Sequence, residues 1–222
     1  MNFVKLTLIS LCLIYGGIVH ADDECLTLGV SIGLSVVHPL ALADDNYDNG
    51  IVFGLSCAVP WKRNWGLVVG LTYNEYPFVE KHFHALPTVP YAGRVGETGD
   101  HSHQFAVDAT VNYLGKNNEA RLLMAPYFGF GLGLLSYYEG ERRWIKYDWT
   151  SEKEYDWIVP ASWKPLVLTA NAVINLNIIR WDKFLLAGSV MSRFRLLGGL
   201  QVDDHSSRLV DVTLSLGVKY KL

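Results

Sequence analysis

Hydrophobic and polar residues alternate with a period of two along most of the chain, which is the pattern of β-strands whose two faces meet different surroundings. Near residue 32, for example, Val30, Ile32 and Leu34 alternate with Ser31 and Gly33. A helix would instead repeat its apolar positions about every 3.6 residues. Eight segments alternate in this way and are predicted to be strands: 26–37, 50–60, 65–77, 103–114, 120–137, 165–179, 183–197 and 208–222.

The connections between these segments are alternately short and long. Short turns are expected near 60–64, 115–119 and 180–183, and long connections at 38–49, 78–102, 138–164 and 198–207. An even number of antiparallel strands, with short turns at one end and long loops at the other, is typical of outer-membrane barrels. The pattern therefore predicts an all-β, eight-stranded antiparallel up-and-down barrel, with extracellular long loops and periplasmic termini.

The two faces of the predicted strands differ in size and polarity. One face is large and aliphatic, whereas the other is rich in serine, threonine, asparagine and glycine. Eight glycines fall on this second face: Gly29, Gly33, Gly54, Gly70, Gly129, Gly131, Gly133 and Gly217. Small polar side chains suit the inside of a narrow barrel, and closed pairing satisfies the backbone as a bilayer requires. A soluble lipocalin-like barrel is the alternative, but it needs a polar exterior and an apolar lumen.

Aromatic residues gather at both ends of the predicted strands, as interfacial anchoring in a membrane would produce. The short-turn end has Trp61, Trp65, Tyr113, Trp181, Phe184 and Tyr220, and the long-loop end has Tyr73, Tyr76, Phe78, Tyr137, Tyr138 and Trp163. A general preference of aromatic residues for strands does not explain why tryptophan concentrates beside turns.

The first segment has the features of a secretory signal peptide. Lys5 precedes an apolar run that is too short to span a bilayer, and Val19-His20-Ala21 is a small-residue cleavage pattern. We expect residues 1–21 to be a signal peptide and 22–222 to be the barrel domain. A membrane anchor is the other interpretation of this segment.

Charge and cysteine content narrow the function classes. Loss of Lys5 with the signal changes the formal net charge from −3 to −4, and there is no basic stripe, so nucleic-acid binding is not expected. Cys25 and Cys57 would then lie in an oxidising compartment. The alternation places them on opposite faces, which argues against a disulfide without excluding one.

On these features the mature chain resembles small outer-membrane barrels such as OmpX, OmpW and the membrane domain of OmpA. The resemblance covers the whole mature length as a pattern, and its most specific part is the C-terminal segment Gly217-Val218-Lys219-Tyr220-Lys221-Leu222. This segment looks like the assembly signal of such proteins, carried by Gly217, Tyr220 and Leu222. The resemblance implies periplasmic chaperones and the barrel-assembly machinery as partners, and outer-membrane lipids and lipopolysaccharide as surroundings.

Charged residues on the inward face are the main candidate site. They are Asp108, Arg193, Arg195, Asp211, Lys219 and Lys221. The last two strands are neighbours, so Arg193 or Arg195 can meet Asp211. The favoured interpretation is an ion-pair network that plugs the lumen, since buried charge is costly unless paired. The alternative is a narrow pore or gate for ions or small solutes.

The third long loop, 138–164, is unusually rich in aromatic and charged residues. Residues 141–149 and 155–158 are expected to continue two strands above the membrane as a hairpin. The exposed aromatic residues can bind lipopolysaccharide sugars, another extracellular ligand or a protein. The favoured interpretation is a self-packed loop whose aromatic rings bury one another.

Four histidines flank the second long loop, at His82, His84, His101 and His103. In a hairpin that continues the barrel strands, 82 would face 103 and 84 would face 101, which suggests a divalent metal site. The alternation puts His82 and His84 in the inward phase and His101 and His103 in the outward phase, so the two members of each pair would point to opposite sides. No metal site and no cofactor are therefore predicted.

An enzyme is also not predicted. Outer-membrane lipid A deacylases and palmitoyltransferases use this architecture, and the deacylase type needs serine, histidine and an acid together on the lipid face. His38 and Glu75 are expected to face outward near the loops, but Ser192 lies elsewhere on the barrel wall. Without a compact constellation, no catalytic residue is assigned. A non-enzymatic structural or surface-interaction role is favoured, with a channel and a lipid-modifying enzyme as alternatives.

Overall fold

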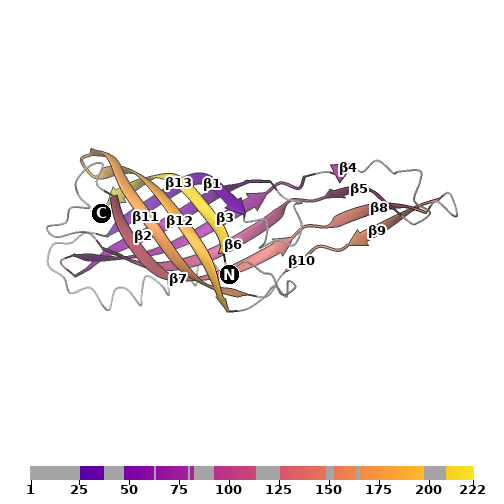
Figure 1. Cartoon of the computed structure of the whole chain (residues 1–222). Helices are drawn as coiled ribbons and strands as arrows, with labels where there is room; N and C mark the ends of the chain where they lie inside the picture. Colours follow the sequence, from indigo (N-terminus) through magenta and orange to yellow (C-terminus); the bar gives the residue numbers. More distant parts are fainter. Residues whose placement is uncertain are drawn as a thin grey trace, which may run out of the picture.

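The computed structural model describes residues 26–37, 48–62, 64–79, 81–82, 93–113, 126–148, 153–163, 166–197 and 209–222. Eight long strands form a closed antiparallel barrel (Figure 1). They are β1 (Thr27–Val37), β2 (Gly50–Lys62), β3 (Trp65–Tyr76), β6 (Ser102–Tyr113), β7 (Pro126–Glu139), β11 (Val167–Trp181), β12 (Phe184–Leu197) and β13 (Leu209–Lys221). The predicted eight-stranded barrel is therefore confirmed.

The order of the barrel strands follows the chain, and the pairing of the first strand with the last closes the ring. β1 pairs with β13 over its full length, and β6 pairs with β7, which continues through β11 and β12 to β13. The strand ends agree with the predicted ones to within a few residues. Some predictions lie outside the described residues: the start of β7 at 120, the turn at 115–119, and the signal peptide 1–21 with Cys25.

Some inward glycines are required by the close approach of neighbouring strands. A Cβ atom on Gly33 would lie 1.9 Å from the carbonyl oxygen of Leu214, and one on Gly131 would lie 1.9 Å from that of Ala109. Neither contact is possible for a real side chain, so glycine at these positions allows the neighbouring strands to approach each other closely.

A second sheet extends the barrel beyond its long-loop end, on the side opposite the C-terminus (Figure 1). It contains β4 (Lys81–His82), β5 (Gly93–Gly99), β8 (Arg142–Asp148) and β9 (Lys153–Val159), in the order β4-β5-β8-β9. The predicted hairpin of the third loop is present as β8 and β9. A short strand, β10 (Ser162–Trp163), pairs with the end of β7 before the chain enters β11.

The second loop does not form the hairpin that the sequence suggested. His82 pairs with Gly96 in β4–β5, whereas His103 pairs with Glu75 in β3–β6. The expected pairing of 82 with 103 is therefore wrong, because the chain after β3 first pairs within the second sheet. His84 lies outside the described residues, and no group of three or more metal-ligating side chains occurs within them.

A compact junction joins the two sheets. The amide of Asp100 donates to the carbonyl oxygen of Glu141 at 2.8 Å, so the β5–β6 and β7–β8 connections are bonded to each other. Arg142 contacts Glu139 at 2.8 Å and the buried carboxylate of Glu97 at 3.9 Å. The extension is thus tied to the barrel wall by partly buried ion pairs.

Candidate functional site

Arg193 is the centre of a polar network that crosses the barrel lumen. Its side chain is fully buried, and its guanidinium donates to both oxygens of Asp211 at 3.0 and 3.2 Å. Its Nη2 also donates to the Asp108 carboxylate at 2.7 Å and to the Thr72 hydroxyl at 2.8 Å. Arg193 belongs to β12, whereas Thr72 and Asp108 belong to β3 and β6. One side chain therefore links strands that are not neighbours in the sheet.

Neutral donors complete the hydrogen bonding of the two carboxylates. Gln104 Nε2 donates to Asp211, and Asn171 Nδ2 donates to Asp108, both at 2.7 Å. Two carboxylates and one guanidinium leave a formal charge of −1. The side-chain amides stabilise this negative charge by hydrogen bonding and carry no charge themselves. Such hydrogen bonds reduce the free-energy cost of burying the ionic group.

Tyr76 extends the network toward the loop end of the barrel. Its hydroxyl donates to Gln104 Oε1 at 2.6 Å and accepts from Asn74 Nδ2 at 3.0 Å. The Ser35 hydroxyl lies 2.9 Å from it and also contacts Thr213 at 3.5 Å. Through these residues the network reaches β1, β3, β6, β11, β12 and β13. The network therefore links most of the barrel strands to one another through hydrogen bonds.

Two tyrosines assigned to the outer aromatic belt by their sequence position point inward instead. Tyr76 has no exposed surface and Tyr137 only 5%. Both fall in the inward phase of the alternation, so the phase predicts their direction better than their position at a strand end. Tyr76, Gln104, Thr72 and Asn171 were not recognised as site residues from the sequence, although their inward polar positions were the available signal.

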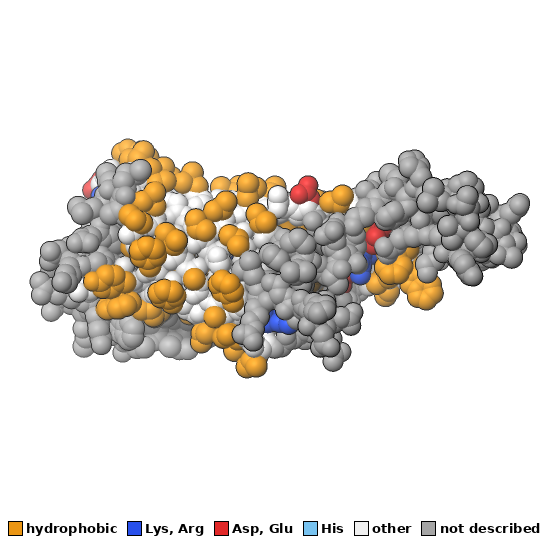
Figure 2. All heavy atoms as spheres, in the orientation of Figure 1, with side chains coloured by type: hydrophobic (Ala, Val, Ile, Leu, Met, Phe, Trp, Pro, Cys, Tyr) orange, Lys and Arg blue, Asp and Glu red, His pale blue; other side chains and the backbone are white. Residues whose placement is uncertain are grey.

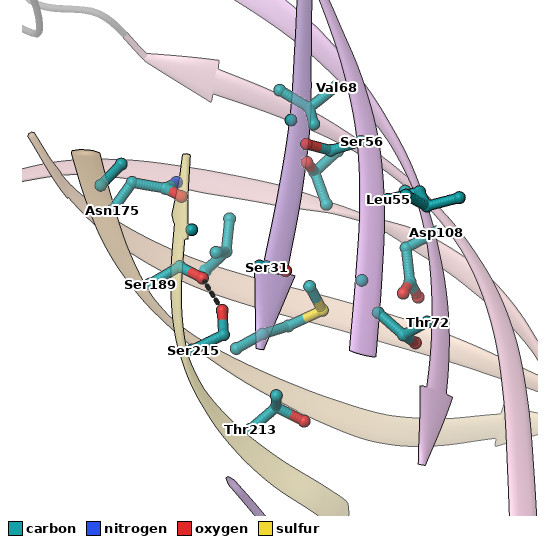
Figure 3. A pocket seen from close by; sticks show the side chains of 18 of the residues that line it. Ser31, Leu55, Ser56, Val68, Thr72, Asp108, Asn175, Ser189, Thr213 and Ser215 are labelled. Carbon is teal, nitrogen blue, oxygen red and sulfur yellow. Dashed lines mark hydrogen bonds between the residues drawn. The ribbon is translucent and has the colours of Figure 1, made fainter. Parts of the chain in front are cut away.

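A small cavity of about 100 Å³ lies in the lumen, between the network and the short-turn end. Glycine and aliphatic residues line it together with hydroxyl and amide side chains, among them Ser31, Ser56, Asn175, Thr213 and Ser215 (Figure 3). Ser189 and Ser215, which face each other on the neighbouring strands β12 and β13, are hydrogen-bonded along its wall at 2.7 Å. A polar cavity of this size has room for several water molecules. Asp108 and Thr72 line its closed end and Lys219 its other end.

The other predicted lumen residues lie away from the centre of the network. Arg195 is partly exposed, two residues nearer the loop end than Arg193. Lys219 lies near the short-turn end, where its ammonium is 3.3 Å from the Tyr127 hydroxyl, and Lys221 is exposed. Of the four residues predicted for the network, the structure thus brings Asp108, Arg193 and Asp211 into direct contact.

The predicted assembly-signal residues form part of the strand that closes the barrel. Gly217 packs against the backbone of β1, where a Cβ would lie 2.5 Å from the Val30 carbonyl oxygen. Tyr220 stacks on Phe184 with ring centroids 4.9 Å apart. The amide of Leu222 donates to the carbonyl oxygen of Leu26 at 2.9 Å, and its side chain is exposed.

Glu75 faces outward near the loops, as expected, and it contacts a histidine, His101, rather than a serine. His101 Nδ1 lies 2.7 Å from Glu75 Oε1, and His103 Nδ1 lies 2.8 Å from the Tyr73 hydroxyl. His38 lies outside the described residues. Ser192 is on β12, where it pairs with Ala172 and Val212, far around the barrel from β3.

The outer surface of the barrel is apolar. Phe130, Leu132 and Ile32 expose 68%, 55% and 54% of their surface, and similar side chains surround them. Figure 2 shows hydrophobic side chains spread over the visible barrel wall, with charged ones toward its ends and on the extension. Buried asparagine, threonine and serine fill the inside. A surface of this kind requires a lipid environment rather than water. The chain is a transmembrane β-barrel.

The soluble lipocalin-like alternative does not fit, because this barrel has the opposite polarity. Every barrel strand is paired on both sides, as the bilayer demands of a spanning sheet. None of the described residues forms a helix long and apolar enough to cross a membrane.

Comparison with known proteins gives structural neighbours but no relatives by sequence. No protein-family model and no curated protein matches the chain. The attachment invasion locus protein Ail of Yersinia pestis is 13% identical, with 90% of this chain and 97% of that chain covered and a TM-score of 0.43. Neisserial surface protein A is 12% identical with the same coverage and a TM-score of 0.49. The translocator domain of NalP from Neisseria meningitidis is 10% identical, with 99% and 96% covered and a TM-score of 0.27. These distant likenesses say nothing of what this chain binds or does.

Proposed function

We propose that the chain is a plugged, non-enzymatic barrel of the bacterial outer membrane, which anchors an extracellular sheet for interaction at the cell surface. The observation that carries this proposal is the fully buried Arg193, bonded to Asp108, Asp211 and Thr72 across the lumen. An arginine held by two carboxylates blocks the path of a solute and stiffens the barrel at the same time.

The orientation follows from the shape of the two ends. In bacterial outer-membrane barrels the short turns face the periplasm and the long loops face the outside of the cell. We therefore place the second sheet outside the cell and the termini in the periplasm. The N-terminal signal and the C-terminal strand support export, periplasmic chaperones and the barrel-assembly machinery as partners, with lipopolysaccharide around the outer half of the barrel.

The extracellular sheet offers a surface for a partner. Trp157 and Ile158 expose 59% and 48% of their surface on the edge strand β9. Exposed large hydrophobic side chains beyond a membrane are typical of interaction sites. Trp144, the β8 residue paired with Trp157, is less exposed and donates to Glu97 at 2.6 Å, so the loop is partly self-packed.

A narrow channel is the second candidate, favoured by the polar cavity on one side of the network. Its lining continues to Asp108, so the Arg193 network is the barrier between this cavity and the loop end of the lumen. A lipid-modifying enzyme is the third candidate. Glu75 and His101 form an acid–imidazole pair on the outer surface, but no serine bonds to that pair within the described residues.

Planar-bilayer recording tests the plug. Purified wild-type protein is expected to give no unitary conductance, whereas a triple variant, Arg193→Ala with Asp108→Asn and Asp211→Asn, should give small, frequent openings. The triple change removes the barrier without leaving uncompensated charge. Reproducible single-channel steps from the wild type would overturn the plugged-barrel proposal in favour of the channel.

The composition of lipid A in cells with and without the protein tests the enzyme candidate, and a changed acyl pattern would contradict a non-enzymatic role.

Cysteine labelling on intact cells tests the orientation. Asp156 lies on β9 with its side chain 55% exposed, and Asp182 lies in the turn between β11 and β12. Asp156→Cys should react with an impermeant maleimide on intact cells, and Asp182→Cys only after permeabilisation, with wild-type protein giving the background. The reverse pattern would invert the proposed topology.

A further inference from the structure

Five aromatic side chains form a closed ring of contacts on the outer surface of the barrel at its loop end. They are Tyr73, His103, Tyr138, Trp163 and Phe105, here called the rim cluster. Successive ring centroids around this circuit are 5.8, 5.9, 5.1, 6.0 and 5.0 Å apart. The rings come from β3, β6, β7 and β10, which places them side by side. Trp163 and Phe105 remain 60% and 45% exposed, so the cluster presents an open aromatic surface.

The rim cluster lies at the border between the apolar barrel wall and the polar extension. Toward the membrane centre it adjoins the exposed side chains of Val107 and Leu134. Toward the loops it adjoins Glu75 and His101, whose side chains are 40% and 55% exposed. A patch at this level faces lipid headgroups, and with the proposed orientation these are headgroups of the outer leaflet.

Polar groups are available around the rings for a ligand. One nitrogen of His103 contacts the Tyr73 hydroxyl, and one nitrogen of His101 contacts Oε1 of Glu75. The second nitrogen of each imidazole and Oε2 of Glu75 have no protein partner within the described residues. A carboxylate and two imidazoles beside exposed rings offer both acceptors and donors in a fixed arrangement.

The charge of this surface decides which headgroup fits. Neither lysine nor arginine belongs to the rim cluster, and its neighbour Glu75 brings a negative charge, so a phosphate would be repelled. A sugar ring fits better, because its apolar C–H faces pack on aromatic rings while its hydroxyl groups bond to carboxylate and imidazole. We propose that the rim cluster, with Glu75 and His101, binds a sugar ring of a glycolipid headgroup in the outer leaflet.

The opposite end of the barrel shows what ordinary membrane anchoring looks like in this protein. There Trp65 contacts Tyr113 edge-on with ring centroids 5.0 Å apart, and Phe184 contacts Tyr220 with tilted rings whose centroids are 4.9 Å apart. These are separate pairs, and Lys183 lies over one of them, with its ammonium 5.9 Å from the centre of the Tyr220 ring. The rim cluster differs by its continuous circuit of rings and by its acid and imidazole groups. Trp65 therefore provides a matched control for simple anchoring.

Binding of defined lipids to the folded protein in detergent tests the proposal, with retention followed by native mass spectrometry. Wild-type protein should bind lipid A at least tenfold more tightly than phosphatidylethanolamine. Trp163→Leu and Glu75→Gln should each weaken lipid A binding about 5- to 10-fold, as loss of one stacking contact or one charged hydrogen bond implies, and leave phosphatidylethanolamine unchanged. Trp65→Leu should keep the preference. Heat-modifiable gel mobility confirms that each variant is folded.

Several results would overturn the proposal. Equal binding of both lipids by the wild type, or an equal loss for both in Trp163→Leu, would make the rim cluster an ordinary anchoring belt. Loss of binding when monophosphoryl lipid A replaces lipid A would show that phosphate is recognised. Equally tight binding of the soluble glucosamine disaccharide would point to a free glycan instead of a glycolipid. Because the assay uses no cells, its failure is separate from a failure of the proposed orientation, which cysteine labelling detects.

Discussion

At the scale of single residues, Arg193 forms ion pairs with two aspartates, Asp108 and Asp211. Replacing the arginine should therefore reduce the stability of the barrel more than replacing one of the two acids. Arg193→Met would leave Asp108 and Asp211 buried without their cation, whereas Asp211→Asn would leave one arginine with one carboxylate. We expect Arg193→Met to lower the free energy of unfolding by about 3–5 kcal/mol and Asp211→Asn to lower it by clearly less. Urea titration in phospholipid vesicles measures both values.

The same reasoning predicts a rescue. Adding Asp108→Asn and Asp211→Asn to Arg193→Met removes the unpaired charges, so the triple variant should be more stable than Arg193→Met alone. If the triple variant were the least stable of the series, hydrogen-bond geometry rather than charge balance would hold the lumen together.

Two inward glycines provide a second residue-scale prediction. A Cβ on Gly131 would lie 1.9 Å from a backbone carbonyl oxygen, whereas one on Gly70 would have its nearest neighbour at 3.7 Å. Gly131→Ala must therefore displace a strand, and it should lower the free energy of unfolding by about 1–3 kcal/mol. Gly70→Ala should be neutral or slightly stabilising. Thermal midpoints from heat-modifiable gel mobility distinguish them, and equal midpoints would contradict the predicted strand contact.

Sequence reasoning predicted the direction of most side chains but not their partners. The alternation put Arg193, Asp211 and Asp108 on the inward face, and adjacency of the last two strands brought the first two together. Asp108 lies on β6, which is not a neighbour of β12, so only barrel closure at this diameter brings it to Arg193. The same holds for Thr72, because contact across a lumen has no signature in local periodicity.

At the scale of elements, the junction between the barrel and the second sheet depends on one arginine. Arg142 is only 13% exposed and contacts Glu139 and the fully buried Glu97, whereas Arg143 is 50% exposed and lies 4.0 Å from Asp156. We expect Arg142→Ala to speed backbone amide exchange in β8 and β9 about tenfold, because it removes compensation from a buried carboxylate. Hydrogen–deuterium exchange of the protein in nanodiscs measures this effect.

Arg143→Ala is the matched control at the next position. Exposed ion pairs contribute little, so its exchange should resemble that of the wild type. Faster exchange in the barrel strands of Arg142→Ala would mean that the junction supports the barrel itself and not only the extension.

The second sheet also shows which elements periodicity cannot assign. The β8–β9 hairpin was predictable, because its two strands follow each other closely in the sequence. The pairing of β5 with β8 joins two different loops, and it exists because β6 and β7 are neighbours whose continuations remain side by side. His82 was placed opposite His103 since a simple hairpin was assumed, whereas β5 occupies that position.

At the scale of the whole molecule, polarity is reversed relative to a soluble barrel, and this reversal was visible in the sequence once the faces were compared. Large aliphatic residues on one face and glycine, serine and asparagine on the other can close into a barrel in only one way when lipid surrounds it. The structure places Leu132 in the middle of β7, 55% exposed, next to Ala109 and Ala170 on the neighbouring strands. It therefore faces the centre of the bilayer.

A charge at this position tests the membrane assignment directly. Leu132→Arg should lower the free energy of unfolding in phospholipid vesicles by about 2–4 kcal/mol, whereas Leu197→Arg, at the loop end of β12 and 68% exposed, should cost at most about 1 kcal/mol. Both leucines are exposed, so burial within the protein predicts the same small effect for both substitutions. Depth in the bilayer alone predicts a difference between them, and equal costs would mean that the apolar exterior is covered by something other than lipid.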